Sequence, residues 1–156
     1  NSTTTGGALP SLGLNRVWVL AGRNTCSASE AIVNGLRGIG VQVNIIGGTT
    51  CGKPHGFTAK DNCGISYFPI EFKGVNNVGF GDYESGFTPT CTASDDFSRE
   101  LGDVNEGLFA AAMYHRANGT CSAAFGNAKQ SQPEGRLLHR PERSNKIHVD
   151  FESLKR

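Results

Sequence analysis

A strand–helix–strand pattern over residues 17–46 constrains the fold of this chain more than any other feature. Residues 17–22 form a short apolar run, as in a buried parallel strand. From Ser27 the apolar residues recur at helical spacing, and Gly38 and Gly40 can end that helix. Residues 41–46 form a second apolar run. Two strands joined by a helix make a βαβ unit, so the sequence predicts an α/β fold. The predicted inward face of the helix consists of Ala28, Ala31, Ile32, Leu36 and Ile39.

The rest of the chain adds one strand and one helix to this unit. Residues 65–72 are predicted to form a strand in which Pro69 requires an edge or bulge position. Residues 47–63 and 74–91 are predicted to be loops, and the latter is rich in Gly, Asn and Asp. A capping box from Asp103 to Glu106 predicts a second helix, which Gly119 ends. We expect a flexible lead over residues 1–16, one folded unit over 17–125 and a polar, basic tail over 126–156.

Length and charge exclude several classes of function. With 156 residues the chain is about one domain long. Its net charge is +1, and 7 of the 15 Lys/Arg fall within residues 127–156, so the folded part offers no basic surface for nucleic acid. No run of apolar residues is long enough to span a membrane. Asp95 and Asp96 lack a His or carboxylate cluster, so we expect no metal and no cofactor.

The candidate chemistry lies at the two ends of the segment from Asn24 to Lys53. A serine at the first turn of a helix, here Ser27, has free backbone N–H groups beside it, and the N–H of Ala28 is the candidate oxyanion donor. Serine needs a base, and a lysine such as Lys53 can be that base when burial disfavours its ammonium form. The pattern alone is weak, because such a serine is usually only an N-cap and a loop lysine is usually solvated. His55 is a candidate for assisting the base.

The five cysteines favour an oxidising compartment: periplasm, cell envelope or extracellular space. The preferred pairing joins Cys51 with Cys63 and Cys91 with Cys121, which leaves Cys26 free. Cys26 with Cys51 is the competing pair, because contact between Ser27 and Lys53 would also bring those two cysteines together.

The segment Ser27-Ala28-Ser29-Glu30, its apolar helix, a strand and Gly48-Thr49-Thr50-Cys51-Gly52-Lys53 resemble the core of the C-terminal processing (tail-specific) proteases. These are Ser/Lys peptidases of the ClpP/crotonase-like fold. The resemblance is close over residues 17–73 and looser up to Asn118. It implies that Ser27 is the nucleophile, that Lys53 is the general base and that the substrate is a peptide or protein.

The chain departs from the family pattern in three places. The separation of Ser27 and Lys53 is 26 residues, one more than expected for the family. Phe57 occupies the position at which many members have a Gln that orients the lysine. Nothing in residues 1–16 matches the upstream strand that supplies the second oxyanion donor, or the PDZ domain that captures substrates. The chain therefore resembles the later half of a catalytic domain, and we expect this incomplete domain to be weakly active or inactive as a fragment.

Three alternatives stay open at the level of the sequence. One is a non-catalytic peptide-binding or assembly module of the same fold, and another is acyl-CoA chemistry on that fold. The third reads Cys26 as a thiol nucleophile with His55 as its partner. Sheet edges exposed by an incomplete domain would also permit self-association.

Overall fold

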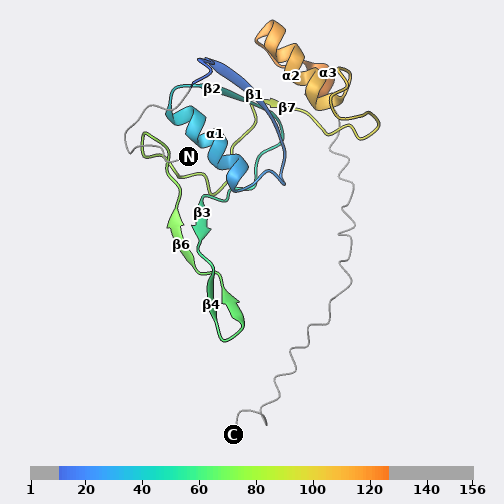
Figure 1. Cartoon of the computed structure of the whole chain (residues 1–156). Helices are drawn as coiled ribbons and strands as arrows, with labels where there is room; N and C mark the ends of the chain where they lie inside the picture. The colour runs from blue at the N-terminus through green and yellow to red at the C-terminus, as the bar shows by residue number, and fades with distance from the viewer. Residues whose placement is uncertain (1–10, 127–156) are drawn as a thin grey trace, which may run out of the picture.

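The structure is a computed structural model that describes residues 11–126, and its centre is a small parallel sheet (Figure 1). The strand order is β1 (Arg16–Ala21), β2 (Gln42–Gly47) and β7 (Cys91–Thr92). β1 pairs with β2 along its whole length, from Arg16 opposite Gln42 to Ala21 opposite Gly47. Helix α1 (Ala28–Gly38) connects these two strands. The predicted βαβ unit and the α/β class are therefore confirmed.

Side chains from the sheet pack against helices on both of its faces. In β2, successive side chains point to opposite faces, so that Ile45 packs with the cluster under α1 and Ile46 with the cluster under α2 (Gly107–Asn118). Both isoleucines are fully buried. The first cluster contains Ala21, Val33, Val43, Ile45, Tyr83 and Phe87. The second contains Ile46, Cys91, Ala93, Ala111 and Ala112, with the short helix α3 (Ala123–Gly126) beside it. The fold has a helix, sheet, helix order of layers.

The inward face of α1 differs from the one predicted. The buried residues of the helix are Glu30, Val33, Asn34 and Gly38, whereas Ile32 and Ile39 are 63% and 65% exposed. Two of these buried residues are polar, and both have hydrogen-bond partners: Asn34 Nδ2 donates to the carbonyl of Phe80, and Glu30 is described below. The prediction holds for Leu36, which packs against the core, but it was wrong for Ile32 and Ile39 because it assigned the inward face to apolar residues only.

A long two-stranded ribbon extends away from the sheet, as Figure 1 shows. It consists of β3 (His55–Phe57) paired with β6 (Ile70–Lys73), followed by β4 (Lys60–Asn62) paired with β5 (Ile65–Tyr67). The prediction of one strand over 65–72 is corrected to two, which separate at Phe68 and Pro69, and part of the predicted loop 47–63 is strand. Positive φ angles at Cys63 and Gly64 form the tight turn between β4 and β5.

The second half of the described chain holds two further corrections. The predicted loop 74–91 is not all surface, because Tyr83 and Phe87 are core residues that stack at 4.7 Å. Helix α2 begins one turn later than predicted. Its N-cap is Glu106, whose carboxylate accepts hydrogen bonds from Leu108 N and Phe109 N, so the predicted capping box is not formed. The predicted stop at Gly119 is confirmed by its left-handed backbone.

No helix among residues 11–126 is long and apolar enough to cross a membrane, and this part of the chain holds no cluster of His, Cys, Asp or Glu suited to a metal ion. The predicted lead (1–16) and tail (126–156) fall largely outside the described residues and stay predictions.

Candidate active site

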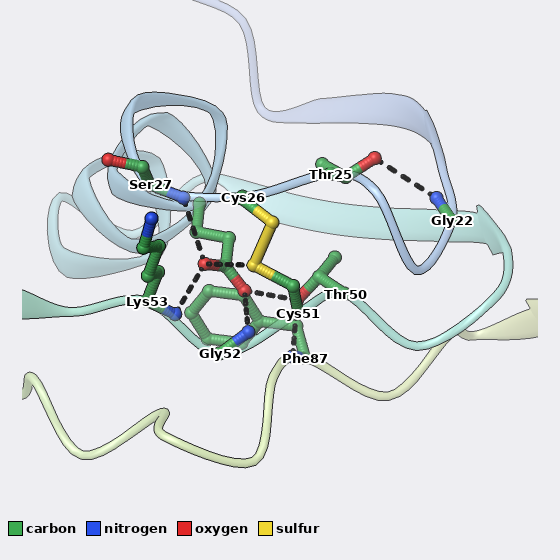
Figure 2. The surroundings of a disulfide bond; sticks show 10 residues. Gly22, Thr25, Cys26, Ser27, Thr50, Cys51, Gly52, Lys53 and Phe87 are labelled. Carbon is green, nitrogen blue, oxygen red and sulfur yellow. Dashed lines mark hydrogen bonds between the residues drawn. A yellow bond between two sulfur atoms is a disulfide. The ribbon is translucent and has the colours of Figure 1, made fainter. Parts of the chain in front are cut away.

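Ser27 lies in the tight turn between β1 and α1, and its backbone is strained. The residue immediately precedes the helix, is exposed and has φ 52° and ψ −112°. A non-glycine residue with positive φ persists only where the surrounding structure holds it there, and such residues cluster at functional sites. In Figure 2 its Oγ lies on the outer side of the turn, away from the buried groups behind it. The hydroxyl is therefore presented to solvent at the end of a strand.

The backbone N–H of Ala28 is available beside this hydroxyl. The next donors are used locally, because Ser29 N donates to Cys26 O and Ala31 N donates to Ser27 O. Within residues 11–126 the N–H of Ala28 has no acceptor. As the first N–H of a helix it also benefits from the positive end of the helix dipole. This group can stabilise a developing negative charge on a substrate oxygen.

The carboxylate of Glu30 fastens the Ser27 turn to the loop that carries Lys53. Glu30 is fully buried. Its Oε2 accepts hydrogen bonds from Ser27 N at 3.0 Å and from Lys53 N at 2.8 Å. Its Oε1 accepts from Gly52 N at 2.8 Å and from Thr50 Oγ1 at 2.6 Å. Figure 2 shows these bonds converging on one side chain. Because one oxygen atom holds both nitrogens, the backbones of Ser27 and Lys53 must lie side by side.

The same hydrogen bonds favour the ionised form of the Glu30 carboxyl. Burial raises the pKa of this carboxyl, but the hydrogen bonds from Thr50, Gly52, Lys53 and Ser27 outweigh it, so its pKa is lowered from the ordinary value of 4.5. Glu30 is therefore a buried anion satisfied by four donors, and within residues 11–126 it forms no ion pair with a cationic side chain. A further contact in Figure 2, from Cys51 Sγ at 3.8 Å, is not a hydrogen bond, because that sulfur is in a disulfide and has no proton.

The loop over residues 84–87 packs against the loop that carries Lys53. Thr50 N donates to Phe87 O, and Phe87 N donates to Thr50 Oγ1 at 2.7 Å. The close approach requires glycine: a Cβ on Gly52 would lie 2.0 Å from Glu84 O, and one on Gly86 would lie 2.0 Å from Thr50 O. Both glycines have positive φ. Residues 86–89, where the family resemblance is looser, therefore belong to a segment that contacts the site.

Lys53 extends toward the Ser27 turn in Figure 2 and is exposed. Its backbone is held by Glu30, but the residue is exposed, so the burial expected of a lysine base is missing in the described part of the chain. His55 is the first residue of β3, is exposed and pairs with Lys73 across the ribbon. Its side chain makes no hydrogen bond within residues 11–126. Phe57, at the position of the family's orienting Gln, is 53% exposed and packs edge-on against Phe68 at 5.4 Å.

Two disulfides are present among the described residues. Cys91 pairs with Cys121, as expected, and Cys26 pairs with Cys51. The preferred pairing of Cys51 with Cys63 was wrong: Cys63 lies exposed at the end of the ribbon, and it is free. The competing pair forms for the reason given for it, namely that the Ser27 and Lys53 segments are neighbours. This disulfide also excludes Cys26 as a free thiol nucleophile.

Sequence reasoning missed the roles of Glu30 and Thr50. Both stand in the segments that carry the family resemblance, yet a glutamate three residues after a helix-starting serine indicates by itself only a capping box. The sequence held no signal for these contacts, because the burial of Glu30 depends on how the helix is rotated against the sheet.

Comparison with known proteins adds one similarity. No protein-family model matches the chain, and no curated protein matches it. Among solved structures, the crystal structure of a "putative S41 protease" from Bacteroides fragilis is similar, with a TM-score of 0.64 and 26% sequence identity. The match covers 70% of this chain and 29% of that chain, so this chain spans less than a third of that protein. The similarity supports the S41 proteases as the broad family and a peptidase-like function at a coarse level.

Proposed function

We propose that this chain carries the nucleophile and the base of a serine peptidase of the C-terminal processing (tail-specific) type, built on a ClpP/crotonase-like α/β fold. Ser27 is the nucleophile, Lys53 is the general base and the N–H of Ala28 is one oxyanion donor. The substrate is a peptide bond of a peptide or protein. No cofactor takes part. The two disulfides favour an oxidising compartment outside the cytoplasm, the periplasm, cell envelope or extracellular space.

One observation carries this proposal: the strained turn of Ser27 is bonded, through the buried Glu30, to the backbone of Lys53. A serine that served only as an N-cap would have no need of positive φ or of a lysine loop fixed beside it. In the reaction, Ser27 Oγ would attack the scissile carbonyl carbon while Lys53 accepts the hydroxyl proton. The carbonyl oxygen, now negative, would receive a hydrogen bond from Ala28 N–H. Lys53 would then protonate the leaving amine, and water would release the acyl group.

Labelling of the full chain with a fluorophosphonate tests the nucleophile and the base together. We expect the label on the peptide that contains Ser27, and we expect Lys53→Ala to slow labelling by about 100-fold or more, the usual contribution of a general base. Ser29→Ala is the matched control, because Ser29 is an exposed serine two residues away, and it should label within about 2-fold of the parent chain. Label on another residue, or an undiminished rate in Lys53→Ala, would overturn the assignment.

The exposure of Lys53 and Phe57 favours a second candidate, a non-catalytic peptide-binding or assembly module of the same fold. A lysine that serves as a base is ordinarily buried, whereas Lys53 is exposed among residues 11–126. Peptide binding that is unchanged by Ser27→Ala, together with absence of label on Ser27, would support this candidate over the peptidase.

A further inference from the structure

The disulfide between Cys26 and Cys51 joins the two segments that carry the candidate catalytic residues. Cys26 is the residue directly before Ser27, and Cys51 is two residues before Lys53. The two Cα atoms are 5.3 Å apart. Cys51 Sγ lies 3.8 Å from Glu30 Oε2. Figure 2 shows Ser27 and Lys53 on one side of the sulfur bridge and the Gly22 to Thr25 turn on the other. The disulfide is thus a covalent counterpart of the Glu30 hydrogen bonds.

The non-covalent links between the same two segments centre on one side chain. Among residues 11–126, they are the Glu30 hydrogen bonds and one backbone hydrogen bond, from Cys51 N to Thr25 O at 3.0 Å. The Ser27 turn is exposed on its outer side, so apolar packing contributes little to holding it. A strained backbone relaxes unless its surroundings determine it. A covalent bond at the residue directly before Ser27 limits that relaxation.

The second disulfide provides the contrast. Cys91 in β7 is joined to Cys121, between α2 and α3, and neither residue adjoins Ser27, Lys53 or Glu30. The two bridges have similar sequence separations, 25 and 30 residues, so they restrict the unfolded chain to a similar degree. Any difference between them at the site must come from their position.

We infer that the Cys26–Cys51 disulfide positions Ser27 against Lys53, so that reduction of this one bridge loosens the candidate site while the fold persists. The inference rests on the proposed function. Reduction by a dithiol is a two-electron step: a thiolate of the reductant attacks one sulfur, the S–S bond breaks through a mixed disulfide, and the reductant leaves as its cyclic disulfide. Cys26 and Cys51 take up two protons and become thiols. A site built in this way is competent in an oxidising compartment and impaired in a reducing one.

Paired removal of the bridges tests the inference, in a Cys63→Ser background that prevents thiol exchange. The variants are Cys26→Ser/Cys51→Ser and, as the matched control, Cys91→Ser/Cys121→Ser. We expect melting temperatures within about 5 °C of each other, because the loops closed are of similar size. Amide hydrogen exchange at Ser27, Gly52 and Lys53 should accelerate about 10-fold or more in the first variant only. Fluorophosphonate labelling of Ser27 should slow about 10-fold to 100-fold in the first variant and less than 2-fold in the control.

Chemical reduction serves as the second measurement, should the first variant fold poorly. In the Cys63→Ser/Cys91→Ser/Cys121→Ser chain the remaining bridge is Cys26–Cys51, so dithiothreitol acts on it alone, and reoxidation should restore both exchange and labelling. Equal exchange at the three amides with and without this bridge would overturn the inference. If oxidised wild-type chain does not label at Ser27, the proposed function fails, and the exchange data alone then decide whether the bridge positions the two segments.

Discussion

Replacement of Glu30 by Gln is the most direct test of how the Ser27 turn and the Lys53 loop are joined. The substitution keeps the size of the side chain and removes one acceptor oxygen. Whichever way the amide is turned, its NH₂ group faces two of the four donors that the carboxylate now satisfies, at 2.6 to 3.0 Å. The Thr50 hydroxyl can turn to accept from that NH₂ group, so either one or two backbone N–H donors lose their acceptor. Each such donor costs about 1–3 kcal/mol, and we therefore expect Glu30→Gln to lower the free energy of unfolding by about 2–4 kcal/mol.

The contribution of Glu30 to stability depends on pH, and its direction follows from the pKa of the carboxyl. Because the pKa of Glu30 is lower in the folded chain than its ordinary value of 4.5, its contribution is complete above that value and declines as the pH falls below it. The difference in free energy of unfolding between the wild-type chain and Glu30→Gln should therefore be constant from about pH 5 to about pH 7. It should decrease in more acidic solution. A loss that does not change with pH would indicate a packing defect instead.

Urea unfolding of the full chain, followed by the fluorescence of Trp18, measures the loss. Trp18 is the single tryptophan of the chain. Glu100→Gln is the matched control, since Glu100 is exposed and its side chain makes no hydrogen bond within residues 11–126, and it should change stability by less than about 0.5 kcal/mol. A loss below about 1 kcal/mol in Glu30→Gln would refute the reasoning that four donors depend on this carboxylate.

Two further predictions concern the loops around the site. Gly52→Ala should destabilise the chain by about 3 kcal/mol or more, because its Cβ would lie 2.0 Å from Glu84 O. Gly64→Ala is the control and should cost about 1 kcal/mol, because Gly64 has a similar positive φ and open space around it. Equal losses of stability in thermal unfolding of the two variants would contradict the predicted clash with Glu84 O. Lys73→Gln removes ion pairs with Asp82 and Glu84 at the base of the ribbon and should lower the melting temperature only slightly in dilute buffer, because exposed ion pairs contribute little. That decrease should vanish in about 1 M NaCl, because salt screens the attraction between exposed charges. A decrease that salt leaves unchanged would show that packing is responsible.

The sequence predicted the βαβ unit because its signals are local. Apolar runs of strand length, a helical repeat and glycine stops all act within a few residues of one another. The pairing of β1 with β2 then follows from chain connectivity. The position of Ser27 at the end of this unit was predictable for the same reason.

The parts that could not be predicted depend on contacts between distant segments. Val33, not Ile32, faces the core, because Glu30 and Asn34 find partners in the loops 50–53 and 76–80 and so fix the rotation of the helix. The Cys26–Cys51 bridge depends on two loops meeting, and for that reason the sequence offered it only as the competing pair. Residues 74–91 looked like surface, yet Tyr83 and Phe87 are needed to fill the space under α1.

The ribbon also has a practical consequence, for the placement of labels. Its far end, β4 and β5, is exposed throughout and contributes to neither core cluster. The turn at Cys63 and Gly64 is thus a natural attachment point, where a dye on the free thiol or an inserted epitope would stand clear of both the sheet and the Ser27 turn. The Cys63 thiol therefore also offers a point for immobilisation, at the end of the ribbon away from Ser27 and Lys53.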